Sequence, residues 1–135
     1  MNKKFLLAFL AVFVAMNCLN FLIHAVLLAG MYQSEAVAKI MRPQAEQIMW
    51  IHFVTALVVS FFFTLIFSKG YEGKGISEGL RFGTYVGMLV AIPMAYDSFA
   101  VYPIPYSLAL QWFFYGVIQY VILGYVAAIV YGKKQ

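Results

Sequence analysis

Four long apolar segments constrain this chain more than any other feature of its sequence. Each is long enough to cross a bilayer as a helix, which takes about 20 residues. They are Phe5–Ala29, Ile48–Phe67, Phe82–Val101 and Ser107–Tyr131. Of the 135 residues, 64% are hydrophobic and only 10% are charged, whereas a typical soluble domain has about 25% charged residues. We therefore expect one all-α transmembrane domain over residues 1–135.

The connections between these segments predict the order of packing. Because they are short, neighbouring helices should pack antiparallel, in an up-down-up-down four-helix bundle. We expect residues 31–47 to be a polar connector with a short surface helix that ends at Pro43, and residues 68–81 to be an exposed loop. Two prolines between Tyr102 and Tyr106 predict a tight turn. The basic start resembles a secretory signal, but its apolar run is long enough to predict an uncleaved span.

The distribution of positive charge predicts the orientation. The N-terminus, the middle loop and the C-terminus lie on one side of the expected bundle and carry seven basic residues, whereas the opposite side carries only Lys39 and Arg42. The seven are Lys3, Lys4, Lys69, Lys74, Arg81, Lys133 and Lys134. The positive-inside rule then puts both termini in the cytoplasm. The sequence thus predicts a multi-pass protein of the cell inner (plasma) membrane, with tryptophans and tyrosines forming an aromatic belt at the outer interface.

Four polar side chains are expected to share one depth in the bilayer. Asp97 is the only acid in any apolar segment, and His24, His52 and Gln111 each lie four or five residues from the expected outer end of a segment. At about 1.5 Å per residue, each lies about 6 Å below the outer boundary. An ionisable group at membrane depth is by default a candidate functional site.

Several roles for this layer are compatible with the sequence. His24, His52 and Asp97 are ligand types that suit a divalent metal with an open coordination position. Two facing histidines would alternatively hold haem iron, and Asp97 would alternatively carry a proton or cation. A purely structural role also fits, in which these side chains hydrogen-bond each other, lock the bundle or reach water.

Further polar residues predict contacts between the first and fourth segments. Asn17 and Asn20 form a stripe with His24 at helical spacing, and Gln119 follows Gln111 on the last segment. Polar residues of membrane helices usually face the bundle interior, so we expect hydrogen bonds between these two helices.

Small residues on the third segment predict a close helix contact. Gly83, Gly87 and Ala91 recur every four residues, so this face should pack closely against the second span, the fourth span or another subunit. Pro93 lies one turn before Asp97 and removes a backbone hydrogen bond, which predicts a kink beside the acid.

Several function classes lack support in the sequence. Cys18 is the only cysteine, which excludes an internal disulfide and multi-cysteine metal clusters. The glycine-rich stretch near Lys69 and Lys74 lacks the Walker pattern, and no nucleophile–base pair is recognisable. Enzymatic activity is therefore the least supported class, and nothing indicates nucleic-acid binding.

The second half of the chain resembles a known group of proteins. The stretch GISEGLRFGTYVGMLVAIPMAYDSFAVYPIPYSLALQWF, with its GLRFG helix start and PIP turn, is similar to uncharacterised small four-span bacterial inner-membrane proteins. NFLIHAVLLAGMY extends this resemblance into the first half. The resemblance implies the four-span fold and a bacterial membrane location, but no activity and no site residues.

Three functions follow as expectations. The first is a structural or accessory subunit in the lipid bilayer, working as a homo-oligomer or in a larger membrane complex. The second is a metal or haem binding protein that uses His24, His52 and Asp97. The third is a small proton-coupled transporter with Asp97 as its coupling residue.

Overall fold

The computed structural model describes residues 2–132, and over that range it is helical with no strand. Within this range, four helical stretches are long and apolar enough to cross a membrane. They are α1 (Lys3–Asn20) with its π-helical continuation η1 (Phe21–Leu27), α4 (Met49–Gly70), α5 (Ile76–Val101) and α6 (Tyr106–Tyr131). The predicted all-α, four-span membrane fold is confirmed.

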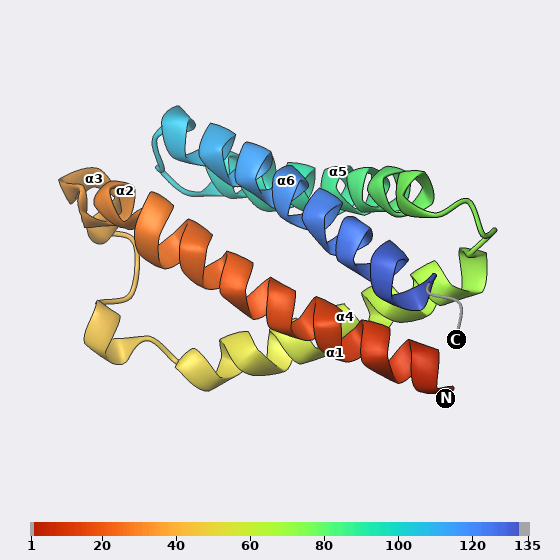
Figure 1. Cartoon of the computed structure of the whole chain (residues 1–135). Coiled ribbons are helices and arrows are strands. Elements are labelled where there is room, and N and C mark those ends of the chain that lie inside the picture. The colour runs from red at the N-terminus through yellow and green to blue at the C-terminus, as the bar shows by residue number, and fades with distance from the viewer. Residues whose placement is uncertain (1, 133–135) are drawn as a thin grey trace.

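The four long helices alternate in direction (Figure 1). The start of α1, the loop between α4 and α5, and the end of α6 lie at one end of the molecule, here called the terminal end. The opposite end, called the connector end, holds the short helices α2 (Ala29–Gln33) and α3 (Glu35–Ala38) and the turn between α5 and α6. Helix α5 packs along α6, while α1 packs against both α6 and α4.

Helices α5 and α6 are in backbone contact along a seam of small residues. A Cβ atom at Gly79 or Gly83 would collide with the carbonyl oxygen of Gly124 or Tyr120, respectively. Farther along the seam, a Cβ at Gly87 would lie 3.1 Å from Val117 Cα. The predicted ridge of small residues on α5 therefore packs against the fourth span, and Gly79 extends it by one turn.

A cluster of apolar side chains joins the helices at the terminal end. Val12 and Met16 of α1, Phe63 and Phe67 of α4, and Leu123 of α6 are all buried there. Phe82 brings α5 into contact with this cluster, with its ring centre 4.9 Å from that of Phe63. All four spans thus meet at this end.

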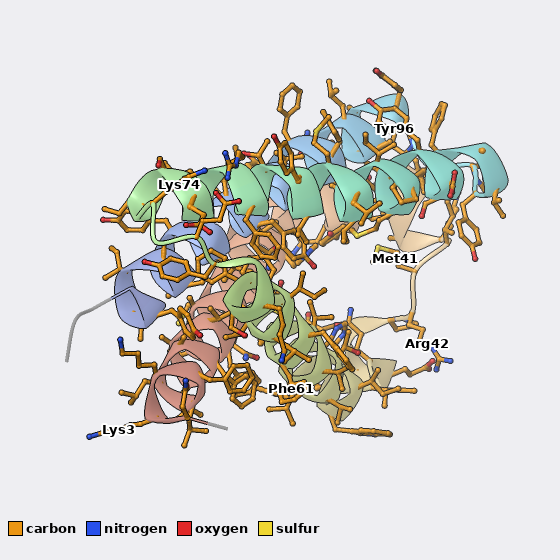
Figure 2. All side chains as sticks on the ribbon, turned by 90° about the vertical axis from the view of Figure 1, so that its right-hand side faces the viewer. Lys3, Met41, Arg42, Phe61, Lys74 and Tyr96 are labelled. Carbon is orange, nitrogen blue, oxygen red and sulfur yellow. The ribbon has the colours of Figure 1, made fainter. Side chains whose placement is uncertain are left out.

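The predicted bundle opens toward the connector end because α4 diverges from α5 (Figures 1 and 2). In the first two turns of α4, every residue from Met49 to Thr55 is exposed, whereas in its last turns Phe63 and Phe67 are buried. The chain enters α4 through the exposed connector, with one 3₁₀ turn, η2 (Gln44–Glu46).

The loop between α4 and α5 is shorter than predicted. Helix α5 begins at Ile76, so part of the expected loop of residues 68–81 is helical. The cause is Glu78, which is buried in the first turn of α5 and accepts hydrogen bonds from the backbone N–H groups of Glu72 (2.6 Å) and Lys74 (2.9 Å). Gly73 and Gly75 adopt positive φ angles of 80° and 72°, which closes the turn at little steric cost.

The short surface helix that the sequence predicted in the connector is present as α3, but it ends at Ala38 and not at Pro43. One side chain of α3, Val37, is fully buried in a small cluster with Ile104, Leu108 and Ala109. The prolines after Tyr102 end α5 and lead into α6, as predicted. This second cluster fixes the connector against the start of α6.

Candidate functional site

The predicted polar layer does not form one site in the single chain. His52 and Asp97 are exposed, while His24 and Gln111 are partly buried. Among residues 2–132, no group of three or more histidine, cysteine, aspartate or glutamate side chains is placed to hold a metal ion. The proposed ligands His24, His52 and Asp97 do not come together as a set of three, because α4 diverges from α5 where His52 and Asp97 lie. The depth argument did not include this divergence.

Asp97 continues the face of α5 that contacts α4 at the terminal end. Phe82 and Val86 lie against the core cluster there. Positions 89, 93 and 97 follow them at helical spacing and therefore share their face. At the connector end this face has lost its partner, since Leu89 is 74% exposed and Pro93 and Asp97 are exposed as well.

His52 continues the matching face of α4. It lies eleven positions before Phe63 and four before Ala56, which puts all three on one side of the helix. Phe63 and Ala56 are buried, but His52 is exposed. We call the α4 face at His52 and the α5 face at Leu89, Pro93 and Asp97 the uncovered faces.

Pro93 does not interrupt α5, which continues from Ile76 to Val101. Its missing N–H group leaves one backbone carbonyl without its helical partner, close to the exposed Asp97 on the same face. A carboxylate and a free carbonyl are both hydrogen-bond acceptors. The uncovered face of α5 thus offers acceptors, whereas a histidine on α4 offers a donor.

His24 lies within the π-helical segment η1, where the backbone hydrogen bonds are one residue longer than in an α-helix. One such bond joins the N–H of Leu28 to the carbonyl of Ile23 (2.8 Å). In an α-helix, residues seven apart share a face. Because the π-helical turn contains one additional residue, residues eight apart share a face across it. His24 and Tyr32 are eight residues apart and therefore lie on the same face.

A hydrogen-bond chain joins three aromatic side chains at the connector end. Trp112 Nε1 donates to Tyr32 Oη (2.9 Å), and Tyr32 Oη lies 2.6 Å from His24 Nδ1. Since an indole N–H is only a donor, the Tyr32 hydroxyl hydrogen remains for a neutral His24 whose Nδ1 is unprotonated. Burial raises the pKa of Tyr32, although the hydrogen bond from Trp112 opposes that shift.

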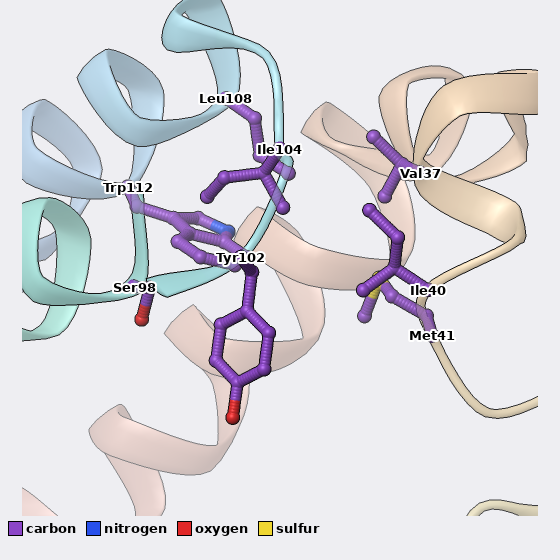
Figure 3. A pocket seen from close by; sticks show the side chains of 8 residues that line it. All are labelled: Val37, Ile40, Met41, Ser98, Tyr102, Ile104, Leu108 and Trp112. Carbon is purple, nitrogen blue, oxygen red and sulfur yellow. The ribbon is translucent and has the colours of Figure 1, made fainter. Parts of the chain in front are cut away.

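A hollow of about 260 Å³ lies beside this chain, between α3, the end of α5 and the start of α6 (Figure 3). Trp112 lines it, and the N–H group of Trp112 is bound to Tyr32. The other walls are mainly apolar, and the polar groups near it belong to Tyr102 and Ser98. This hollow can take an apolar group but offers no cluster of catalytic side chains.

The predicted contact between the first and fourth spans is present. Gln119 Nε2 of α6 donates to Asn20 Oδ1 of α1 (2.7 Å), and Gln119 is buried. Asn17 instead donates to the carbonyl of Phe13 within its own helix (2.8 Å). The interior polar stripe thus supplies one bond between helices, which favours a packing role over a pathway.

Sequence reasoning missed three residues that organise these sites. Tyr32 and Trp112 were expected only as members of an aromatic belt, and no sequence signal marks the π-helix that brings His24 to Tyr32. Glu78 was missed because it was assigned to a loop. Its position three residues after Gly75 resembles the acidic position of a capping box, which was the available signal.

The geometry therefore separates a hydrogen-bonded aromatic chain from two uncovered faces that carry a histidine and an acid. Comparison of the chain with protein-family models, with curated proteins and with solved structures finds no match.

Proposed function

We propose that this chain is a structural or accessory membrane protein that works as a homodimer, with its uncovered faces as the interface. The observation that carries the proposal is the exposure of His52 and Asp97 within transmembrane helices. Ionisable side chains in membrane segments almost always face protein or a water-filled cavity. A partner helix at these faces would supply that environment.

A second copy fits better than an unrelated partner because the two faces are complementary. His52 is three residues from the start of α4 and Asp97 is four from the end of α5, so both lie about 4–6 Å inside the connector end. In a two-fold dimer, His52 of each copy meets Asp97 of the other at the same depth. The pairing therefore occurs twice.

The packing of the single chain leaves the required surface available. Helix α5 packs its small residues against α6, and this contact leaves Asp97 exposed. The first two turns of α4 contribute no buried residue to the chain's own core. A second copy would bury these turns without disturbing the seam.

The distribution of charge supports an orientation with both termini on the cytoplasmic side of the membrane, which we propose to be a bacterial inner membrane. The terminal end carries most of the lysine and arginine residues, and the connector carries Lys39 and Arg42. In the connector, Lys39 also forms an ion pair with Glu35 (2.6 Å), which offsets its charge. The interface would then lie in the outer half of the bilayer.

Sedimentation equilibrium in density-matched detergent tests the proposal. The wild-type protein should have the mass of two chains, and Asp97→Ala and His52→Ala should each shift it toward one chain. Glu35→Ala, which removes an exposed acid of the connector, is the matched control and should leave the dimer intact. A monomeric wild type, or equal mass in all four proteins, would reject the proposed interface.

A further inference from the structure

A second hollow, of about 350 Å³, lies at the terminal end among α1, α4 and α6. Its walls include the side chains of Phe5, Phe61, Leu65 and Tyr131, and its rim carries Asn2, Ser68 and Lys69. Phe61 and Lys69 are eight residues apart on α4, so the hollow extends over about 12 Å along that helix. It is apolar at depth and polar at the membrane boundary.

Lys69 places a positive charge on this rim, and two more lysines lie on the adjoining turn of α1. Lys3 and Lys4 lie between Asn2 and Phe5 in the first turn of α1, and Lys69 is in the last turn of α4. In Figure 2, Lys3 and Phe61 both lie in the lower part of the molecule, with the Lys3 side chain pointing outward. Among residues 2–132, the ion pairs are those of Lys39 and Lys74, so these three lysines have no carboxylate partner there.

Backbone and amide donors add to this charge. The N-terminal end of α1 carries the positive pole of an 18-residue helix. The Asn2 side-chain oxygen accepts a hydrogen bond from the N–H of Phe5 (2.8 Å), which leaves its amide N–H₂ group available as a donor. The rim therefore combines these donors with the ammonium group of Lys69, and Lys3 and Lys4 add positive charge on the adjoining turn of α1. Hydrogen-bond donors beside a cation are the chemistry that binds a phosphate.

We propose that this hollow binds one anionic phospholipid, with its phosphate at Lys69, Asn2 and the start of α1. An acyl chain then lies against Phe61 and Leu65. A membrane lipid matches both halves of the site because the hollow begins where three spans reach the membrane boundary. Basic pockets between transmembrane helices are known to take such head groups.

Native mass spectrometry of the full-length protein, titrated with palmitoyl-oleoyl phosphatidylglycerol, tests this site. Lys69→Gln should weaken binding about fivefold, since one lysine near an anionic surface contributes a free energy equivalent to that factor. The matched control is Lys74→Gln, because Lys74 belongs to the adjoining loop, pairs with Glu72 and does not line the hollow. The affinity of Lys74→Gln for phosphatidylglycerol should stay at the wild-type value.

Two further measurements distinguish a specific lipid site from a general attraction to anions. Leu65→Trp fills the hollow without changing charge and should weaken phosphatidylglycerol binding to a similar extent, with circular dichroism checking that the protein is folded. Inorganic phosphate at the same concentration should not compete. The proposal is overturned if Lys69→Gln and Lys74→Gln weaken binding equally, if phosphatidylcholine binds as tightly as phosphatidylglycerol, or if free phosphate displaces the lipid.

Discussion

The seam between α5 and α6 leads to a graded prediction for glycine-to-alanine substitutions. At Gly83, the added methyl group would collide with the carbonyl oxygen of Tyr120, which belongs to the backbone and cannot rotate away. At Gly87, the nearest atom is Val117 Cα at 3.1 Å, so a shift of a few tenths of an ångström suffices. At Gly30, nothing lies within 4 Å.

The magnitude follows from two opposing effects. Alanine in a helix is favoured over glycine by about 1 kcal/mol, whereas overpacking a tight contact costs about 1–3 kcal/mol. Gly30→Ala has only the favourable effect and should be neutral or stabilising. Gly83→Ala has both, so it should be less stable than Gly30→Ala by about 1–3 kcal/mol, with Gly87→Ala between the two.

Unfolding of the purified protein from mixed micelles by added dodecyl sulfate, followed by circular dichroism, measures this order. All three substitutions add the same methyl group, so Gly30→Ala controls for helix propensity. If Gly83→Ala were as stable as Gly30→Ala, the backbone contact between α5 and α6 would be refuted.

Three further predictions concern individual contacts. The pKa of Tyr32 is raised above its unfolded value of about 10, so its contribution to stability is complete below that pH and is lost as the pH rises through the folded pKa. The 295 nm absorbance difference between wild type and Tyr32→Phe should therefore titrate above pH 10, and titration below it would contradict the burial. A double-mutant cycle of Asn20→Leu and Gln119→Leu should give a coupling of about 0.6 kcal/mol, while zero coupling would contradict the 2.7 Å bond. Glu78→Ala removes the acceptor of two loop N–H groups and should destabilise the protein by about 1.5–3 kcal/mol, with faster hydrogen exchange in the loop; unchanged exchange would contradict its role.

The four spans were predictable because hydrophobic runs of this length have one common solution in a bilayer. The ridge of Gly83, Gly87 and Ala91 was also readable, since small residues four apart share a helix face. Its partner was not readable, because several neighbours were equally compatible with the pattern. The structure resolves that choice in favour of α6.

The arrangement of the polar residues was less predictable. Depth along a helix follows from counting residues, but lateral position depends on helix tilt, which packing determines. Equal depth for His52 and Asp97 therefore did not imply contact, and α4 diverges where both lie. His24 met a partner, Tyr32, only because η1 is a π-helix, which no residue pattern marks.

The start of α5 was misplaced for a local reason. Four glycines and several charges suggested an exposed loop up to Arg81, but Glu78 satisfies two loop N–H groups and lets the helix start at Ile76. The glycines divide into two kinds: Gly73 and Gly75 shape the turn, whereas Gly79 contacts α6. Composition alone does not separate these roles.

Disulfide trapping between two copies tests the proposed dimer most directly. In a Cys18→Ser background, one tagged chain carries His52→Cys and a differently tagged chain carries Asp97→Cys. Mixed in one membrane and oxidised, these two chains should form a covalent heterodimer, since a disulfide requires Cβ atoms about 3.5–4.5 Å apart. The matched pair Val54→Cys and Phe99→Cys, on other faces of the same helices, should give no covalent heterodimer. Absence of the first heterodimer, or equal yield from the second pair, would contradict the account.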